Sequence, residues 1–331
     1  MYAVVMTAPG GPEVLSLTEC PEPEIVTPTQ VKVRLSAAGV NPIDTKLRAR
    51  GVFYPDALPA ILGCDGAGVV VKAGAQAGIA VGTRVAFCHG GLGGVPGNYA
   101  QFTVIEAAEV VSVPEAVDDV EAAALPLALI TAWESLIDRA RLRAEQTVLV
   151  IGGAGGVGHL AVQLACLHGA RVLATAGSDE NAAFLRDLGV EAVIRHDQEP
   201  IAQAAQRLTE GRGVDVTLDA VGGHCFGEAI AATTYAGDVV TLHEPPADAP
   251  WKEARRRNLR VSFDLMLTPM LSPLPEARAR QIVILRHGLD WVAEGRLRVE
   301  IAAVLPLEQA GEAHRRVGGG HTRGKLVLQV T

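Results

Sequence analysis

The stretch ILGCDGAG at residues 61–68 places a thiol directly beside a carboxylate. Cysteine and aspartate side chains are both metal ligands, so the stretch raises the possibility of a metal site. A catalytic zinc ion takes about three protein ligands, of which Cys64 supplies one, and the dipeptide Cys88–His89 could bring others to it. A cysteine among small residues can also be a buried apolar group or a reactive thiol, although no histidine or lysine flanks Cys64 in the sequence.

A second candidate site is the glycine-rich segment GGAGGVG at 152–158, which directly follows the apolar run TVLVI. Gly153, Gly155 and Gly158 match the pattern G-x-G-x-x-G, and apolar residues at helical spacing follow them. Such glycines let the backbone approach a pyrophosphate, whose charge the start of the following helix stabilises. The second strand pattern, ARVLATA, completes the context of a dinucleotide-binding turn. A glycine-rich connection without a ligand is the alternative.

The end of that second strand bears on the choice between NAD and NADP. An NAD site usually has an acidic residue there, which binds the ribose 2′-hydroxyl. This sequence reads LATAGSDEN at 173–181 and has no acid at the expected place. The missing carboxylate leaves room for a 2′-phosphate, so we predict NADP rather than NAD. Candidate partners of the phosphate, each of which could instead be a surface residue, are Asn181, Arg195, His196 and Arg323.

These residues need two kinds of structure to position them. The first hundred or so residues contain valine-rich runs broken by glycine and proline, which predicts a mostly β domain. From residue 147 onward, strand patterns alternate with amphipathic helix patterns, which indicates a parallel sheet covered on both faces. A helical segment at 275–295 and the strand pattern GKLVLQV follow, and we expect this end of the chain to fold back onto the first domain.

Composition limits the classes of function. The net charge is −8, and the arginine-rich stretch EARRRNLR at 253–260 is expected in a solvated loop, so nucleic-acid binding is disfavoured. The longest apolar stretch, at 122–133, is too short to span a bilayer and contains a proline. The five cysteines are widely spaced and form no CxxC pair, and the sequence begins without a signal-peptide pattern. We therefore predict a cytoplasmic protein that does not associate with membranes.

Taken together, these stretches resemble the zinc-independent quinone oxidoreductase type of the medium-chain dehydrogenase/reductase superfamily. The resemblance implies an α/β fold with a GroES-like β-rich domain at 1–122 and 269–331, and a Rossmann domain with a doubly wound parallel sheet at 123–268. The motifs follow the family's order along the chain, and those that carry the resemblance are AAGVNPIDTKLR at 37–48, LPAILGCDGAGVV at 58–70, AAALPLALITAW at 122–133, the glycine turn, GVDVTLDAVGG at 213–223 and LPLEQAGEAHRRV with GKLVLQV near the end.

The resemblance also bears on the metal question. Zinc-dependent relatives hold their catalytic metal with three residues, and the corresponding positions here are Asn41, Cys64 and Leu127. One thiol with an amide and a leucine does not supply three ligands. The sequence also has no cluster of four cysteines for a structural zinc. We therefore predict that no zinc is bound.

Without a metal, fixed hydrogen-bond donors must stabilise charge that develops on a substrate oxygen. By the resemblance, this region is lined by Asn41, Tyr54 and Thr131. The amide of Asn41 or the phenol of Tyr54 would donate to the oxygen, and Thr131 would position the nicotinamide. The alternatives are structural, a turn at Asn41–Pro42 and ordinary packing for Tyr54. Lys46 stands where the family usually has a tyrosine, a departure that bears on quinone-like substrates.

The predicted function is NADPH-dependent hydride transfer to a quinone or an α,β-unsaturated carbonyl compound. The alternatives are a zinc-recruiting alcohol dehydrogenase and a dinucleotide-binding protein with a structural or regulatory role. We expect a homodimer that pairs LRVSFDL at 259–265, whose apolar edge would otherwise be exposed. The glycine-rich loop at 89–98 is expected to shape the substrate pocket. The predicted cofactor contacts are Gly153, Ala154, Gly155, Gly156, Val157, Gly158, Gly177, Ser178, Asn181, His196, Val221, Leu242 and Arg323.

Overall fold

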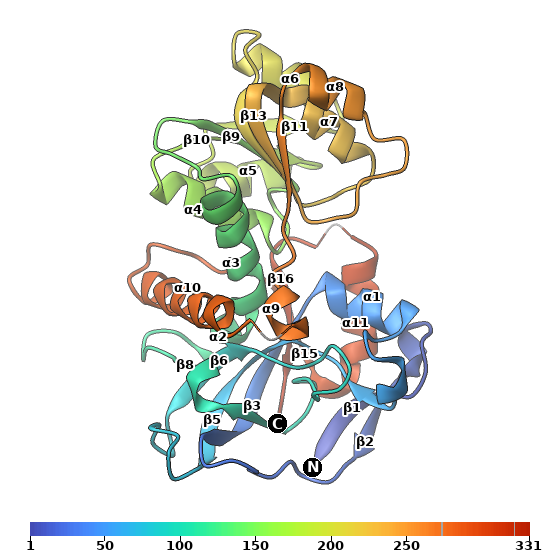
Figure 1. Ribbon diagram of the computed structural model, residues 1–331, viewed down its shortest axis with the longest axis vertical. Helices are drawn as coiled ribbons and strands as arrows, with labels where there is room; N and C mark the ends of the chain where they lie inside the picture. Colours follow the sequence, from blue (N-terminus) through green and yellow to red (C-terminus); the bar gives the residue numbers. More distant parts are fainter. Residues whose placement is uncertain (273, 321) are drawn as a thin grey trace. The chain divides into compact units, whose positions relative to one another are not determined.

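The computed structural model describes residues 1–272, 274–320 and 322–331. The chain forms two compact units (Figure 1). Unit 1 comprises Met1–Ala128 and Leu267–Thr331, and unit 2 comprises Leu129–Met266. Both ends of the chain therefore contribute to the same unit.

Unit 1 is rich in antiparallel strands. In its larger sheet, of seven strands, six follow the order β15-β16-β3-β5-β6-β8, while β7 pairs with β3. The C-terminal strand β16 runs antiparallel to β3, with Leu326 opposite Val40. A smaller sheet has the order β2-β1-β4. The strands are β1 (Tyr2–Met6), β2 (Leu15–Glu19), β3 (Gln30–Val40), β4 (Ala60–Ile61), β5 (Asp65–Ala73), β6 (Arg84–Cys88), β7 (Phe102–Glu106), β8 (Val111–Ser112), β15 (Ile301–Pro306) and β16 (Lys325–Gln329).

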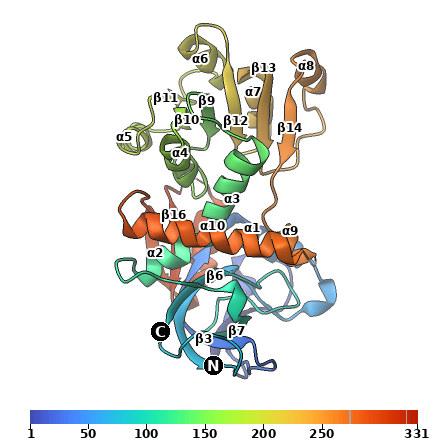
Figure 2. The same cartoon turned by 60° about the vertical axis from the view of Figure 1, so that its left-hand side comes forward.

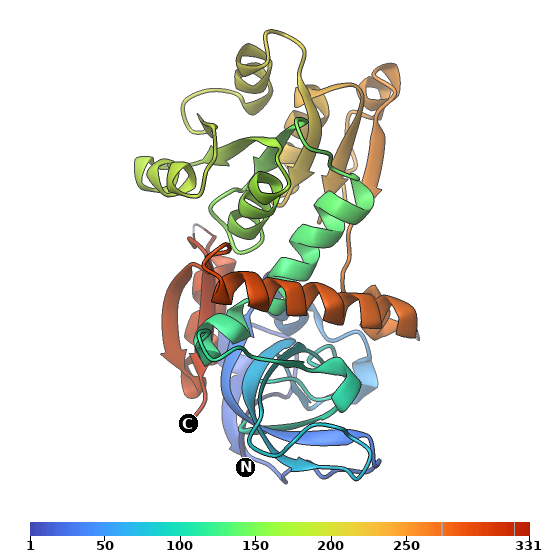
Figure 3. The same ribbon diagram turned by 90° about the vertical axis from the view of Figure 1, so that its left-hand side faces the viewer.

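Helix α2 (Asp119–Ala124) packs closely on this sheet. A Cβ atom added at Gly39 in β3 would lie 2.4 Å from the backbone oxygen of Ala123 in α2, so the strand and helix can approach only without a side chain there. Figure 3 shows α10, in orange, as the longest helix of this unit. The helices are α1 (Pro42–Arg50), α2 (Asp119–Ala124), α9 (Thr268–Leu271), α10 (Pro275–Ala293) and α11 (Ala310–Gly318), with short 3₁₀ turns that include η2 (Pro55–Ala57) and η3 (Ala107–Glu109). Helix α3 (Pro126–Trp133) contains the boundary between the units.

Unit 2 is built on a six-stranded parallel sheet of order β11-β10-β9-β12-β13-β14 (Figure 2). The central strand β9 is buried along its whole length, as expected for a strand covered on both faces. The strands are β9 (Thr147–Ile151), β10 (Arg171–Ala176), β11 (Ala192–Arg195), β12 (Val214–Asp219), β13 (Thr233–Thr241) and β14 (Arg260–Phe263), and the helical segments are η4 (Glu134–Arg139), α4 (Gly158–Leu167), α5 (Asp179–Asp187), α6 (Ile201–Leu208), α7 (His224–Ala232) and α8 (Trp251–Arg256).

The strand order in unit 2 is that of the doubly wound Rossmann fold, in which the first strand lies in the middle and the chain then winds in both directions. The predicted α/β class, with a β-rich unit and a parallel-sheet unit, is confirmed. One local expectation was wrong. The arginine-rich stretch at 253–260 is not a loop, because it forms the end of α8 and the start of β14. Glu253 stabilises it locally by pairing with Arg256 and Arg257 at 2.7 and 2.6 Å.

Candidate functional site

The glycine turn of unit 2 connects the carboxyl end of β9 to the start of α4. The backbone N–H of Gly152 donates to Oγ1 of Thr175 at 2.9 Å, which ties the turn to β10. A Cβ atom at Gly158 would lie 2.1 Å from the carbonyl oxygen of Gly152, so the helix can start here only with glycine. A Cβ atom at Gly155 would meet only that same oxygen among the described residues, at 3.3 Å. That oxygen would have to move by a few tenths of an ångström to admit a side chain, so packing requires glycine much less strictly at 155 than at 158. The rest of the space around Gly155 suits the close approach of a ligand.

The position of this turn in the sheet also fits a dinucleotide. The strand order reverses between β9 and β12, and ligands of such sheets bind at the carboxyl ends of the strands at that point. The start of α4 offers backbone N–H groups and the positive end of the helix dipole to a pyrophosphate. The residues present therefore fit the diphosphate of a nicotinamide dinucleotide.

The loop after β12 lies against the glycine turn. Asp219, the last residue of β12, is fully buried and accepts hydrogen bonds from the backbone N–H groups of Val221 and Gly222 at 3.0 and 2.8 Å. A Cβ atom at Gly152 would come within 2.8 Å of the Val221 side chain. Leu242 donates its N–H to the Asp219 carbonyl at 3.1 Å. The structure thus brings Val221 and Leu242, both predicted cofactor contacts, to the same edge of the sheet as the turn.

A second group of predicted contacts gathers where β10 and β11 end. A Cβ atom at Gly177 would lie 3.0 Å from Nε2 of His196, so these two residues adjoin. Ser178 caps α5, with its Oγ accepting from the N–H of Asn181 at 3.2 Å. Arg195, at the end of β11, forms ion pairs with Asp179 and Asp197. A guanidinium group is therefore held next to the place where an NAD-binding acid would stand.

By the resemblance, Asn41, Cys64 and Leu127 stand where metal-dependent relatives hold zinc. These three positions meet around Asp65 in unit 1. Nδ2 of Asn41 donates to Oδ2 of Asp65 at 2.9 Å, and the backbone N–H of Leu127 donates to Oδ1 at 2.9 Å. Nζ of Lys325 donates to the Asn41 side-chain oxygen and lies 3.7 Å from Oδ2 of Asp65. A lysine amine thus lies beside this buried carboxyl group, and burial raises the pKa of Asp65 and lowers the pKa of Lys325.

Cys64 is fully buried next to this group, and burial raises the pKa of its thiol well above the usual value. In the metal-free protein the thiol form is therefore favoured over the thiolate that attacks an electrophile. The Cys88 side chain turns toward Met270, with the two sulfur atoms 3.9 Å apart, and His89 turns toward Glu109. Across the described part of the chain, no three His, Cys, Asp or Glu side chains gather as a metal site would require.

Asn41 is 1% exposed, and its backbone is also fixed, because its N–H donates to Asp44 Oδ2 at 2.8 Å. The same oxygen accepts from the Tyr99 hydroxyl at 3.1 Å. Burial, together with the nearby Asp65 carboxylate, raises the pKa of Asp44 to about 7. The predicted donor Asn41 therefore has its side-chain oxygen and one side-chain N–H engaged within the protein, and its contact with substrate stays a prediction.

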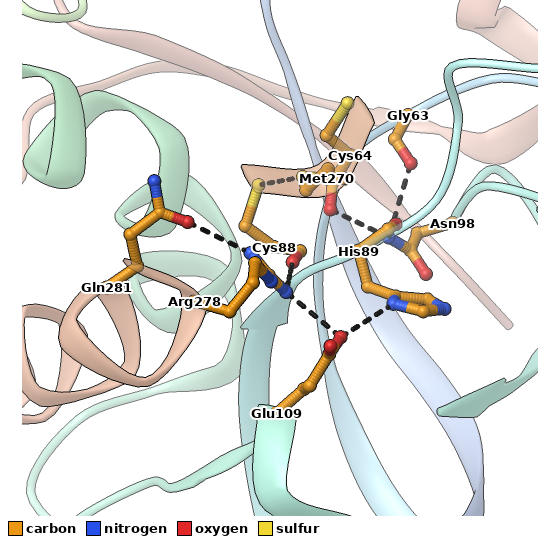
Figure 4. A network of polar contacts seen from close by, with 9 residues as sticks. All are labelled: Gly63, Cys64, Cys88, His89, Asn98, Glu109, Met270, Arg278 and Gln281. Carbon is orange, nitrogen blue, oxygen red and sulfur yellow. Dashed lines mark hydrogen bonds and ion pairs between the residues drawn. The ribbon is translucent and has the colours of Figure 1, made fainter. Parts of the chain in front are cut away.

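Tyr54, the second predicted donor, is 46% exposed and lines a pocket of about 360 Å³ that lies wholly within unit 1. The pocket wall also includes Leu92 and Met270, His89 from the loop at 89–98, and two charged residues that were not predicted, Glu109 and Arg278 (Figure 4). The loop at 89–98, which was expected to shape the substrate pocket, lines this pocket, but no sequence signal pointed to Glu109 or Arg278. The third predicted catalytic residue, Thr131, is 6% exposed in α3 and belongs to unit 2.

Arg323 was predicted as a partner of the coenzyme phosphate. It belongs to unit 1, where it pairs with Glu300 at 2.9 Å.

Comparison with known proteins identifies the family. The family model described as the alcohol dehydrogenase GroES-like domain matches residues 27–115, and the one described as zinc-binding dehydrogenase matches residues 188–328. A quinone oxidoreductase of Pseudomonas aeruginosa is 30% identical over 327 residues, which cover 98% of each chain. The protein belongs to the quinone oxidoreductase type of the medium-chain dehydrogenase/reductase superfamily. The predicted resemblance is thereby confirmed.

Other members of this superfamily resemble the whole chain in structure. The Escherichia coli quinone oxidoreductase complexed with NADPH has a TM-score of 0.88 at 25% identity. The match covers 99% of the present chain and 100% of the Escherichia coli chain. An NAD-dependent alcohol dehydrogenase has a TM-score of 0.89 at 32% identity, with full coverage of both chains. A phenolphthiocerol/phthiocerol polyketide synthase chain from Mycobacterium tuberculosis is 35% identical over 307 residues, 91% of this chain, but the chain spans only 14% of its length. None of the helices in the described residues has the length and apolar character needed to cross a membrane.

Proposed function

We propose that this quinone oxidoreductase-type protein is a cytoplasmic, NADPH-dependent enzyme that works without zinc and reduces a quinone or an α,β-unsaturated carbonyl compound. The observation that carries the proposal is the glycine turn at the switch point of the sheet, where Gly158 is required by packing and a Cβ atom at Gly155 would meet a single backbone oxygen among the described residues. Family membership supports the reaction class, oxidation and reduction.

Holding the coenzyme is the proposed task of unit 2. The turn from Gly153 to Gly158 would bind the diphosphate through backbone N–H groups, and Val221 and Leu242 would line the adjoining strand ends. When bound, the reduced nicotinamide supplies the hydride for the reaction. The proposed part of Thr131 is to position the nicotinamide ring.

The preference for NADPH rests on the end of β10. No acidic residue stands there, and Gly177 lies against His196 with Arg195 next in the chain. We propose that Arg195, His196 and Asn181 bind the 2′-phosphate, with Asp179 and Asp197 holding the guanidinium in place. The NADPH complex of the Escherichia coli relative supports this choice. The structurally similar NAD-dependent alcohol dehydrogenase is the precedent for the alternative coenzyme, NAD.

The proposal that the enzyme works without zinc rests on the side chains at the three positions that would bind the metal. Asn41 and Leu127 cannot replace thiolate or imidazole ligands, and Cys64 is a buried thiol with a raised pKa. We propose that the phenol of Tyr54 or the second side-chain N–H of Asn41 stabilises charge on the acceptor oxygen instead. The five cysteines are all free thiols, which suits a reducing compartment such as the cytoplasm.

The test is a panel of acceptors assayed with purified protein. NADPH and NADH are first titrated to obtain dissociation constants, and NADPH consumption is then followed with benzoquinones, naphthoquinones, and linear and cyclic enones. We expect tighter binding of NADPH, turnover of at least one acceptor class, and equal rates with and without a zinc chelator.

Two results would contradict the proposal in different ways. Coenzyme binding without turnover of any acceptor would favour a dinucleotide-binding protein with a structural or regulatory role. Stoichiometric zinc by elemental analysis, with activity lost on chelation, would favour an alcohol dehydrogenase that recruits a metal.

A further inference from the structure

The pocket of unit 1 contains a polar group that the proposed function does not use. His89 Nδ1 lies 3.0 Å from Oε2 of Glu109, and Nη2 of Arg278 lies 3.0 Å from the same oxygen (Figure 4). These residues come from three separate segments: the loop that follows β6, η3 and α10. All three line the pocket of about 360 Å³ beside Tyr54 and Met270.

The backbone at His89 is held rigidly. Its N–H donates to the carbonyl of Cys64 at 2.7 Å, and its carbonyl accepts from Nδ2 of Asn98 at 2.9 Å. Asn98 is fully buried and donates to the Cys64 carbonyl as well, at 2.9 Å. A side chain mounted on such a backbone keeps a fixed direction, which a binding group requires.

Arg278 acts within the protein rather than on a ligand. It is 8% exposed, and its Nη1 donates to Oε1 of the fully buried Gln281 at 3.1 Å. Its Nη2 donates to the Cys88 carbonyl at 2.9 Å as well as to Glu109. Arg278 therefore fixes Glu109, and Glu109 in turn fixes the imidazole ring.

Glu109 is ionised at neutral pH. Although partial burial acts in the opposite direction, the hydrogen bond from His89 and the charge of Arg278 lower the pKa of the Glu109 carboxyl to about 2. A carboxylate can only accept hydrogen bonds, so Nδ1 of His89 must carry a proton. The second ring nitrogen, Nε2, lies on the side of the ring away from Glu109 (Figure 4), and it makes no hydrogen bond to any of the described residues.

We propose that His89 binds an oxygen atom of the electron acceptor through Nε2, with Glu109 and Arg278 as positioning residues. The inference rests on the proposed function and deepens it, because it assigns the acceptor to this pocket. A protonated ring donates Nε2–H to the carbonyl oxygen of the oxidised acceptor, and Glu109 balances its charge. A neutral ring accepts from the hydroxyl group of the reduced product.

The shape and lining of the pocket define the class of ligand. Leu92, Val95, Pro269, Met270 and Leu271 give it apolar surface, while the charged groups sit together on one part of the wall. The volume lies at the low end of the range for small-molecule sites. A small, mostly apolar ring or chain that carries a carbonyl oxygen matches both features, and quinones and enones share that chemistry.

Two substitutions separate the pocket-facing function of His89 from its contact with Glu109. In His89→Asn the amide nitrogen can replace Nδ1 and keep the bond to Glu109, but nothing replaces Nε2. In His89→Gln the longer amide reaches the place of Nε2. We expect His89→Asn to raise the acceptor KM about tenfold, with the coenzyme dissociation constant and the Tm unchanged. His89→Gln is expected to restore most of the loss. His168→Asn, at an exposed histidine after α4, serves as the matched control.

A binding measurement separates this inference from the proposed function. Quinones and enones are titrated into the coenzyme-free protein, and the imidazole resonances are followed by NMR, with His89 assigned from its loss in His89→Asn. A selective shift of His89 with either acceptor class supports the inference, even where turnover fails. Turnover by the wild type with an unchanged KM in His89→Asn, or acceptor binding without any shift at His89, would overturn the inference and leave the proposed function standing.

Discussion

At the scale of single residues, two glycines of the turn are expected to have different roles. Gly158 is needed for the fold, whereas Gly155 is proposed to be needed for binding the coenzyme. Neither Gly155 nor Gly158 has a left-handed φ, so alanine suits both backbones, and the two positions differ only in space. The Cβ atom would strike backbone 2.1 Å away at Gly158, but would meet its nearest neighbour at 3.3 Å at Gly155.

We therefore expect Gly155→Ala to fold with a much smaller loss of Tm than Gly158→Ala, while its affinity for NADPH falls about tenfold or more, that is, by at least about 1.4 kcal/mol. Gly158→Ala is expected to lower the free energy of unfolding by about 1–3 kcal/mol, because backbone must move to admit the methyl group. Thermal melts and coenzyme titrations of the two variants side by side give the answer. If Gly155→Ala bound NADPH like the wild type, the turn would not be the diphosphate site.

Single residues also show the limit of what the sequence predicts. The glycine turn was predictable because its pattern, its preceding strand and its following helix are all local in the chain. The group of His89, Glu109 and Arg278 was not, since its members are separated by 20 and 169 residues and meet only through the fold of unit 1. The role of Lys325 near Asn41 was missed for the same reason, because 284 residues separate them.

At the scale of elements, the π-helical segment η4 adjoins the end of β14 in a way that buries a carboxyl group. Asp264, directly after β14, is 4% exposed and lies 3.6 Å from Nε of Arg139. Burial, followed by the neighbouring Glu134 carboxylate, raises the pKa of Asp264 to about 8 from its usual 3.8. The folded protein therefore binds this proton more tightly than the unfolded chain does.

The sign of the stability effect follows from linkage. The contribution of Asp264 to the free energy of unfolding is complete below pH 3.8, declines as the pH rises, and is lost once the pH passes about 8. We expect Asp264→Asn to match the wild type in stability near pH 4 and to exceed it near pH 9. Urea unfolding across this range measures the difference, with the exposed Asp248→Asn as control. If the free energies of unfolding of the wild type and Asp264→Asn changed in parallel with pH, the Asp264 carboxyl would have the same pKa in the folded and unfolded chain.

Elements also show why the fold could be predicted more fully than its details. The alternation of strand and helix patterns, together with valine-rich runs, determines the parallel sheet of unit 2. The stretch 253–260 was misjudged because charge alone indicated a loop, whereas Glu253 pairs with two arginines and supports a helix instead. Local ion pairs at helical spacing were the missed signal.

At the scale of the whole molecule, β14 is the end strand of the unit 2 sheet. Its last residue, Phe263, is 56% exposed, and Leu265 just beyond it is 51% exposed. An apolar edge strand invites pairing with another chain. We propose that two copies pair β14 across a two-fold axis to form a homodimer.

Sedimentation velocity at micromolar concentration is expected to show a dimer for the wild type and a monomer for Phe263→Lys, because a charge at the edge opposes pairing. Leu167→Lys, at a half-exposed leucine on α4, should leave the dimer intact. A monomeric wild type would contradict the proposal.

The pairing of β16 with β3 has a consequence for how the molecule is made. Lys325 contacts Val40 across 285 residues of sequence, so the second half of β3 lacks this neighbour while the ribosome translates everything in between. Unit 2 can close as soon as residue 266 has emerged, whereas the N-terminal part of unit 1 waits with an open sheet edge. Cotranslational folding should therefore run from the middle of the chain outward, and the nascent N-terminal strands are where a chaperone would be needed first.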